Sequence, residues 1–317
     1  MTNALEPLQE RSRWKGRGVQ IDIVTVPYRY DRRGDGAGNG PDALLAAGLV
    51  DRLASVGIQA SDPVIAELPD DERTDDSIAV NIGRLGAHTA NHVAASRAGG
   101  SRVMVLSGDD TAMVGVVSGL QRAHGAEARI GLVWLDAHGD FNTPDTSYSG
   151  ILAGMPVAIL AGLAGPLWRG AAGLAAPIAT DRIVISGVRE LDEREETLLN
   201  STNVQVVRGH DHDGHERAIE RLARQCDMLC LHVDLDVLDP GLVPSSGTPE
   251  PGGLTVEETA RFVQAVTDTG KVVVLSIAGL NPGAGKRGLQ STASTLALLE
   301  IVVPAWAPES GALHASA

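Results

Sequence analysis

Short apolar runs alternate along this chain with longer stretches in which apolar residues recur at helical spacing. Continuous apolar runs of this length are typical of strands that are buried on both faces of a sheet. We expect strands over residues 19–26, 102–107, 129–135, 182–187, 203–207, 228–235 and 271–277. We expect helices over residues 43–57, 76–97, 112–124, 153–163, 189–199, 214–224, 255–268 and 288–303.

The repeated strand–helix order predicts an α/β fold, a three-layer α/β/α arrangement around a central, mainly parallel sheet. The 317 residues contain no linker, repeat or low-complexity block that would divide them. A single catalytic domain is therefore expected over residues 18–308, between a flexible N-terminal segment (1–17) and a flexible tail (309–317). Ligands of such sheets bind beyond the carboxyl ends of the strands, so polar residues at those ends are the first candidates for a site.

Two acidic clusters follow buried strands. Asp136-Ala137-His138-Gly139-Asp140 comes after the strand at 129–135, and Asp234-Leu235-Asp236 comes at the end of the strand at 228–235. Charged groups at such places are costly unless they are paired or bind a metal. Residues two apart in an extended segment point the same way, so the acids and the imidazole of each cluster should converge. The sequence therefore predicts a centre of two metal ions that activates water, for which carboxylates with one imidazole favour manganese, and also suit magnesium, iron or zinc.

Two further segments are candidates for the same site as these clusters. Ser107-Gly108-Asp109-Asp110-Thr111 reads by itself as a turn and a helix cap, but next to the other acids Asp110 becomes a candidate sixth ligand. The polar stretch between residues 139 and 154 reads by itself as a surface loop. Above a metal site, the same loop becomes a candidate to hold the substrate.

The charge and the cysteine content narrow the class of protein. A formal net charge of −14 argues against a nucleic-acid or anionic-membrane partner, because both require a basic surface. Cys226 and Cys230 are too few for a disulfide framework and are read as small buried side chains. No stretch has the order of a signal peptide or the length of a membrane span, so a cytoplasmic enzyme acting on a small molecule is expected.

Taken in order, these motifs resemble the arginase–agmatinase (ureohydrolase) family over most of the chain. The matching segments are Ile21 to Pro27 with Gly40-Pro41, Ser107 to Asp110, Asp136 to Pro144, Asp234 to Pro240, Gly247 to Pro249, Gly252 to Thr255 and Asn281-Pro282. The resemblance implies a metal-dependent amidinohydrolase with two divalent ions, Mn²⁺ first among them. Its expected reaction is cleavage of a C–N bond in a guanidino- or amidino-bearing amino acid by a hydroxide that bridges the metals. A homo-oligomer, trimer or hexamer, is also implied.

The resemblance further implies roles for individual residues. Asp136 and Asp234 would bridge both metals, Asp110 and Asp140 would complete one metal site, and His138 and Asp236 would complete the other. His138 and Asp140 would also be the catalytic residues. The implied substrate-binding residues are Asn142, Ser147, Ser149, Asp192 (with Glu190 beside it) and Thr248. These last residues hint at a substrate that is itself an α-amino acid.

The chain also departs from the family pattern. The family's histidine ligand is Asp110 here, its proton-shuttling histidine is Ala153, its guanidinium-pairing glutamate is Gly279, and an aspartate of the same signature is Ser276. Without the glutamate, a less basic N-hydroxyguanidine such as N-hydroxyarginine fits better than arginine, and Asp140 or solvent would protonate the leaving amine. Restoring a glutamate at Gly279 is expected to improve handling of a cationic guanidine.

The same departures leave two alternatives open. The scaffold could act on a different C–N or amide-like substrate. It could also be a non-catalytic or regulatory homologue that binds metal and assembles with an active partner.

Overall fold

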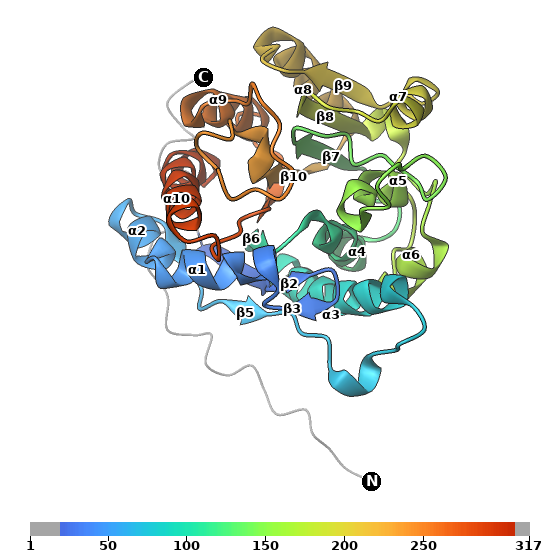
Figure 1. Ribbon diagram of the computed structural model, residues 1–317, viewed down its shortest axis with the longest axis horizontal. Coiled ribbons are helices and arrows are strands. Elements are labelled where there is room, and N and C mark those ends of the chain that lie inside the picture. Colours follow the sequence, from blue (N-terminus) through green and yellow to red (C-terminus); the bar gives the residue numbers. More distant parts are fainter. Residues whose placement is uncertain (1–19, 308–317) are drawn as a thin grey trace.

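The computed structural model describes residues 20–307, so the flexible ends expected at 1–17 and 309–317 lie outside the described residues. Its centre is a sheet in the order β4-β1-β6-β11-β10-β7-β8-β9, with β5 also paired to β1 (Figure 1). Every pairing in this sheet is parallel. The strands are β1 (Gln20–Val26), β4 (Gln59–Ala60), β5 (Val64–Ile65), β6 (Arg102–Ser107), β7 (Ile130–Leu135), β8 (Ile183–Val188), β9 (Gln205–Arg208), β10 (Met228–Asp234) and β11 (Val272–Ala278). A separate antiparallel hairpin joins β2 (Tyr28–Arg29) to β3 (Arg32–Arg33).

Helices cover both faces of the sheet, and each face has its own apolar core. The first core includes side chains of α1 (Gly40–Ala46), α2 (Leu49–Ser55), α8 (His212–Gln225), α9 (Val256–Thr267) and α10 (Lys286–Trp306). The second includes α3 (Ile78–Ala98), α4 (Met113–His124), α5 (Pro156–Leu160), α6 (Pro166–Ala172) and α7 (Glu193–Asn200). The predicted three-layer α/β/α fold is therefore confirmed.

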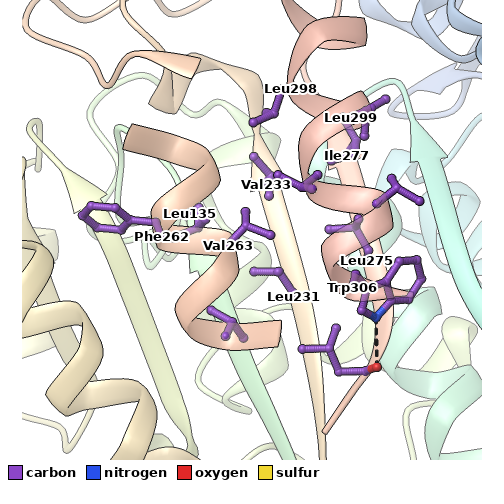
Figure 2. Close-up of a cluster of buried hydrophobic side chains, with 14 of the residues drawn as sticks. Leu135, Leu231, Val233, Phe262, Val263, Leu275, Ile277, Leu298, Leu299 and Trp306 are labelled. Carbon is purple, nitrogen blue, oxygen red and sulfur yellow. Dashed lines mark hydrogen bonds between the residues drawn. The ribbon is translucent and has the colours of Figure 1, made fainter. Parts of the chain in front are cut away.

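The two cores follow from the alternation of side chains along each strand. In β10, Leu231 and Val233 face the first core and Cys230 faces the second, as expected because successive side chains point to opposite faces of a sheet. Figure 2 shows α9 and α10 packed on the first face, where the indole Nε1 of Trp306 donates a hydrogen bond to the carbonyl of Val272 at 3.0 Å. Cys226 and Cys230 are buried free thiols, as predicted.

Three predicted helices differ from the observed ones. The helix expected over 43–57 is two helices, because Gly48 adopts a left-handed conformation with φ +83° between α1 and α2. The helix expected over 153–163 is a 3₁₀ turn over 152–154 followed by α5, which begins at Pro156. The helix expected from residue 189 begins at Glu193, because Asp192 is its N-cap and forms a capping box with Glu195.

The strand order brings the predicted clusters together. The neighbouring strands β6, β11, β10 and β7 lie at the centre of the sheet and run in the same direction. Their carboxyl ends therefore meet at one edge. Asp110 follows β6, Asp136 follows β7 and Asp234 ends β10, so residues more than a hundred positions apart in sequence converge there.

Candidate metal centre

The two acidic clusters are tight turns. The Oδ1 of Asp136 accepts a hydrogen bond from the backbone N–H of His138 at 2.7 Å. The Oδ1 of Asp234 does the same with the N–H of Asp236 at 2.8 Å, at the start of the 3₁₀ turn η7 (Leu235–Val237). In each case an aspartate caps the amide two residues later. The expectation of extended, alternating segments was therefore wrong, although the expected convergence of the side chains is observed.

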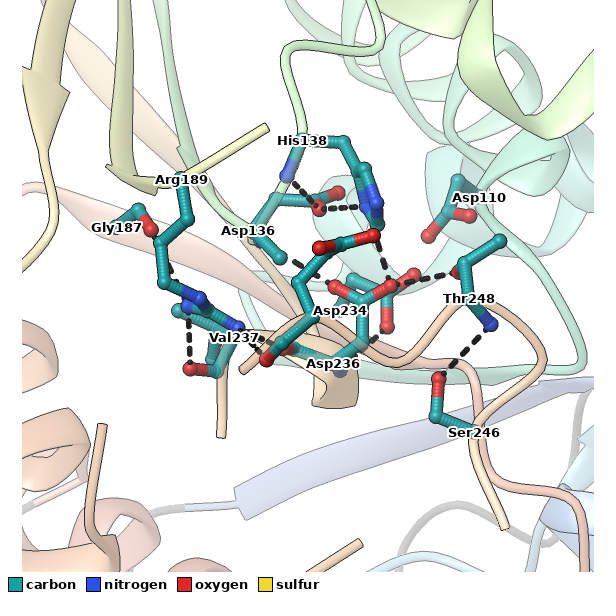
Figure 3. Close-up of polar contacts among 12 residues, drawn as sticks. Asp110, Asp136, His138, Gly187, Arg189, Asp234, Asp236, Val237, Ser246 and Thr248 are labelled. Atoms are coloured by element: carbon teal, nitrogen blue, oxygen red, sulfur yellow. Dashed lines mark hydrogen bonds and ion pairs between the residues drawn. The ribbon is translucent and has the colours of Figure 1, made fainter. Parts of the chain in front are cut away.

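Six predicted ligands meet in this region, and five of them form two overlapping groups. Asp136, His138 and Asp236 offer ligand atoms within 4.8 Å of one another, and so do Asp110, Asp136 and Asp234. Figure 3 shows these side chains turned toward a common space above the strand ends. Asp136 belongs to both groups, which is the arrangement expected of a carboxylate that bridges two ions.

Asp140, the sixth candidate, belongs to neither group. It lines a small cavity that Asp110, His138, Asp234 and Asp236 also line. Its Oδ2 is buried and has no hydrogen-bond partner within residues 20–307. Its backbone has φ +47°, a conformation that is unfavourable for a residue other than glycine. A buried carboxylate oxygen without a partner is costly, and a bound cation would satisfy it. The residues present therefore fit a pair of hard divalent ions.

The pKa shifts of the ligand candidates also favour a bound cation. Burial and the charge of Asp236 raise the pKa of Asp136 to about 7. Burial and neighbouring carboxylates also raise the pKa of Asp140 and that of Asp234 well above their ordinary values. Burial opposes protonation of His138, but its Nδ1 lies 3.2 Å from oxygens of both Asp136 and Asp236, and these contacts raise its pKa to about 12. The site thus gathers carboxylates whose mutual repulsion a bound cation would offset.

Most of the predicted substrate-binding residues line a cavity of about 200 Å³ beside the ligands. Asn142, Ser149, Asp192 and Thr248 line it, whereas Ser147 does not, although its hydroxyl oxygen lies 3.5 Å from that of Ser149. The amide of Asn142 donates a hydrogen bond to Oδ2 of Asp192 at 3.1 Å. The hydroxyl of Thr248 donates one to Oδ2 of Asp236 at 2.8 Å, which links this wall to the metal cluster (Figure 3).

Two departures from the family pattern lie at this site. Ala153 lines the cavity. Gly279 follows β11 with φ +88°, and a Cβ atom there would lie closer than 3.0 Å to Oδ1 of Asp234. A glutamate therefore cannot be restored at residue 279 without moving a metal-ligand candidate. This contact opposes the expected gain in handling of a cationic guanidine, which stays a prediction.

Sequence reasoning missed two residues that lie directly beneath the ligands. The indole of Trp134 donates a hydrogen bond to Oδ2 of Asp136 at 2.9 Å, and Nε2 of His232 lies 2.9 Å from Oδ1 of Asp110. Trp134 and His232 precede Asp136 and Asp234 by two positions in their strands. Since residues two apart share a face of a strand, that spacing was the signal that could have found them.

Two other supporting residues were also missed. The guanidinium of Arg189 donates hydrogen bonds to the backbone carbonyls of Asp236 at 2.7 Å, Val237 at 3.0 Å and Glu250 at 3.2 Å (Figure 3). Glu195 is buried and accepts hydrogen bonds from the N–H groups of Phe141 and Asp192. The carbonyls that Arg189 contacts lie about 50 residues or more away in the chain, so no local pattern predicts its role. The Asp192–Glu195 spacing of a capping box was a local signal for Glu195, but not for its contact with Phe141.

The fold and this cluster together define an α/β protein with a candidate metal centre at the carboxyl edge of its sheet. The sequence model of the Arginase family matches residues 19–303, and the chain belongs to this family, whose members are metal-dependent amidinohydrolases with two metal ions. The predicted family and class of enzyme are thus confirmed.

Known arginases resemble this chain along most of their length. Arginase-1 of Homo sapiens is 32% identical over 282 residues, which cover 84% of this chain and 86% of that protein. Arginase of Bacillus subtilis is 30% identical over 273 residues, covering 83% of this chain and 90% of that protein. The solved structure of arginase from Bacillus caldovelox superimposes with a TM-score of 0.79 at 27% identity, covering 90% of this chain and 98% of that one.

Within residues 20–307, no helix combines the length and apolarity needed to cross a membrane. The cytoplasmic location and the homo-oligomeric state stay predictions.

Proposed function

We propose that this chain is a two-metal hydrolase that cleaves a C–N bond in a guanidino- or amidino-bearing amino acid. The observation that supports it most is the pair of ligand groups that share Asp136 beside a small cavity. Asp110 and Asp140 would hold one ion with Asp136 and Asp234, and His138 and Asp236 would hold the other. Two bound divalent ions, Mn²⁺ in our proposal, would lower the pKa of a water molecule enough to make it a nucleophile at neutral pH.

The cavity walls favour a substrate with an amino-acid end. Asn142 and Asp192 form a hydrogen-bonded pair on one wall, with Ser149 close by. The amide and hydroxyl groups can receive the substrate carboxylate, and the Asp192 carboxylate can receive the substrate ammonium group. Such charge-assisted hydrogen bonds are among the strongest that a site of this size can offer.

At the opposite end of the substrate, residue 279 is a glycine where the family pattern has a glutamate. Without a carboxylate there, a guanidinium loses an anchor worth about 1.5–3 kcal/mol. An N-hydroxyguanidine, which is less basic, loses less. We therefore propose N-hydroxyarginine or a similar compound as the substrate, ahead of arginine.

Proton transfer to the leaving amine falls to Asp140 in this proposal, because Ala153 has no group that could donate a proton. Asp140 lines the cavity beside the other ligand candidates. Its carboxylate could take the proton that the attacking water loses and pass it to the leaving amine.

The test combines metal analysis with an assay. Purified protein is loaded with Mn²⁺ and its metal content is measured, and release of urea and hydroxyurea is then followed with arginine, N-hydroxyarginine and a wider panel of guanidines. We expect two ions per chain and faster turnover of N-hydroxyarginine than of arginine. The Asp136→Asn variant is the control and should lose both metal and turnover.

The other outcomes are equally informative. Two ions per chain with no turnover on the whole panel would favour the non-catalytic homologue, for which the changes at residues 110, 153 and 279 are the supporting observations. A folded protein that takes up no divalent metal would overturn the proposal altogether.

A further inference from the structure

Three side chains lie side by side beneath the metal-ligand candidates. Trp134 of β7, His232 of β10 and Ser276 of β11 occupy the same register across neighbouring strands. They precede Asp136, Asp234 and Ala278 by two positions, so they share the face of the sheet that carries the ligands. We call Trp134, His232 and Ser276 the supporting row.

His232 is the centre of the supporting row and is fully buried, with 0% of its surface exposed. Its Nε2 lies 2.9 Å from Oδ1 of Asp110, and its Nδ1 lies 3.1 Å from the hydroxyl oxygen of Ser276. Its ring packs on that of Trp134 with 4.0 Å between the centroids. Both ring nitrogens are thus engaged, and the ring has no freedom to turn.

The partners decide which nitrogen carries the hydrogen. A carboxylate that binds a metal can only accept, so with a metal in place Nε2 of His232 would donate to Asp110. Nδ1 would then accept from the hydroxyl of Ser276. Within residues 20–307 the other oxygen of Asp110, Oδ2, accepts no hydrogen bond, and Asp110 lines the cavity.

We propose that His232 is a positioning residue for Asp110 and sets how tightly one of the two metal ions is held. Its N–H occupies Oδ1, so that Oδ2 is the oxygen left for the metal, and the carboxylate stays in one orientation. The donor also offsets part of the negative charge that an aspartate brings to a position where the family pattern has a neutral imidazole. The inference rests on the proposed metal centre.

Loss of the hydrogen bond between His232 and Asp110 should weaken the binding of only one of the two metal ions. Asp110 belongs to the ligand group with Asp136 and Asp234, whereas His138 and Asp236 belong to the other. Removing a hydrogen-bonded support of a ligand lowers metal affinity about 10- to 100-fold. We therefore expect the affinity for the more weakly bound metal ion to fall by this factor. The affinity for the other ion should change little.

The experiment compares three variants of the full chain. His232→Leu removes the donor, and His232→Gln restores an N–H that reaches Asp110. His215→Leu is the matched control, because His215 is also 0% exposed and its Nδ1 also contacts a serine hydroxyl, that of Ser186 at 2.8 Å, but it lies outside both ligand groups. Mn²⁺ binding is measured by calorimetry, and the electron paramagnetic resonance spectrum reports whether two Mn²⁺ ions are coupled.

We expect His232→Leu to bind the second Mn²⁺ about 10- to 100-fold more weakly and to lose the coupled-pair spectrum at a concentration that saturates the wild type. His232→Gln should recover both, and His215→Leu should bind as the wild type does even if it melts earlier. Two tightly held ions in a folded His232→Leu variant would overturn the inference. A wild type that never holds two ions would instead contradict the proposed function.

If His232→Leu does not fold, Ser276→Ala decides. It keeps the imidazole but removes the hydroxyl that holds Nδ1, so the same Mn²⁺ should bind at least about threefold more weakly. Unchanged affinity in Ser276→Ala would then overturn the inference.

Discussion

Gly279 lies so close to the carboxylate of Asp234 that a side chain at residue 279 would displace it. The backbone there has φ +88°, and the nearest neighbour of an added Cβ would be Oδ1 of Asp234. The glycine is therefore fitted to the position of a metal-ligand candidate, and the space that the family's glutamate would need is already taken.

The first prediction concerns this contact. Gly279→Ala should weaken Mn²⁺ binding at least about tenfold, because moving a ligand costs as much as removing its support. Gly279→Glu should do the same and gain no affinity for arginine. Both are measured by Mn²⁺ titration of the metal-free protein.

The control for that prediction is Gly100→Ala. Gly100 has a similar φ of +82°, but an added Cβ would meet nothing within 4 Å. This variant should lose about 1–2 kcal/mol of stability from backbone strain and bind Mn²⁺ normally. Normal Mn²⁺ binding by Gly279→Ala as well would show that Asp234 can move without consequence.

The second prediction separates metal binding from folding. Burial and neighbouring carboxylates raise the pKa of Asp234, so at neutral pH this group opposes folding of the metal-free chain. Asp234→Asn removes the charge and keeps an oxygen that can accept from the N–H of Asp236. We expect the melting temperature of the metal-free variant to equal or exceed that of the wild type, and the increase caused by Mn²⁺ to disappear.

Asp31→Asn provides the contrast. Asp31 is buried and paired with Arg73 at 2.9 Å, away from the cavity, so its neutralisation should lower the melting temperature and leave the effect of Mn²⁺ intact. An Asp234→Asn variant that still gains stability from Mn²⁺ would exclude Asp234 as a necessary ligand.

The third prediction is a pH dependence of opposite sign with and without metal. The folded metal-free chain holds protons on Asp136 up to about pH 7, and on Asp140 and Asp234 well above their ordinary pKa, whereas the unfolded chain releases them near pH 4. Because the folded state binds more protons in this range, its stability should fall as the pH rises from about 4 to about 7. His138, with a pKa of about 12, makes the stability of the metal-free protein continue to fall above pH 6.5.

Asp236 acts in the other direction. Burial raises its pKa, but its hydrogen bonds, the one with His138 above all, outweigh burial and leave the pKa lowered. The resulting loss of stability appears only as the pH drops below about 4. Metal ions replace the protons, so Mn²⁺ affinity should increase with pH. Denaturant titrations at pH 5 and pH 7.5, in chelator and in Mn²⁺, measure both trends. A metal-free protein that is more stable at pH 7.5 would contradict the assigned pKa directions.

The fourth prediction concerns Arg189, whose guanidinium holds the carbonyls of Asp236, Val237 and Glu250 together. A lysine cannot reach several carbonyls in this planar geometry. Arg189→Lys should therefore lower the free energy of unfolding by about 1–3 kcal/mol, measured by denaturant titration. Arg208→Lys, at an exposed pair with Glu196, should change it by less than about 0.5 kcal/mol. Equal effects of the two substitutions would show that Arg189 adds no more than a surface contact.

Much of the fold and the location of the site could be predicted from local pattern. Continuous apolar runs mark buried strands because water is excluded from both faces of the sheet, and acids placed directly after such runs mark its carboxyl edge. Asp136 and Asp234 were found in this way. Their capping turns are also local, since each carboxylate contacts an amide only two residues away.

The sequence by itself thus determined the fold class, the edge that carries the site and most of the candidate ligands, because burial and turn formation depend on neighbours along the chain. The tertiary structure alone decided that His232 meets Asp110, 122 residues away, and that Gly279 abuts Asp234. Those contacts depend on β6, β11, β10 and β7 lying side by side. That order is settled by how whole layers pack, and no local pattern of residues encodes it.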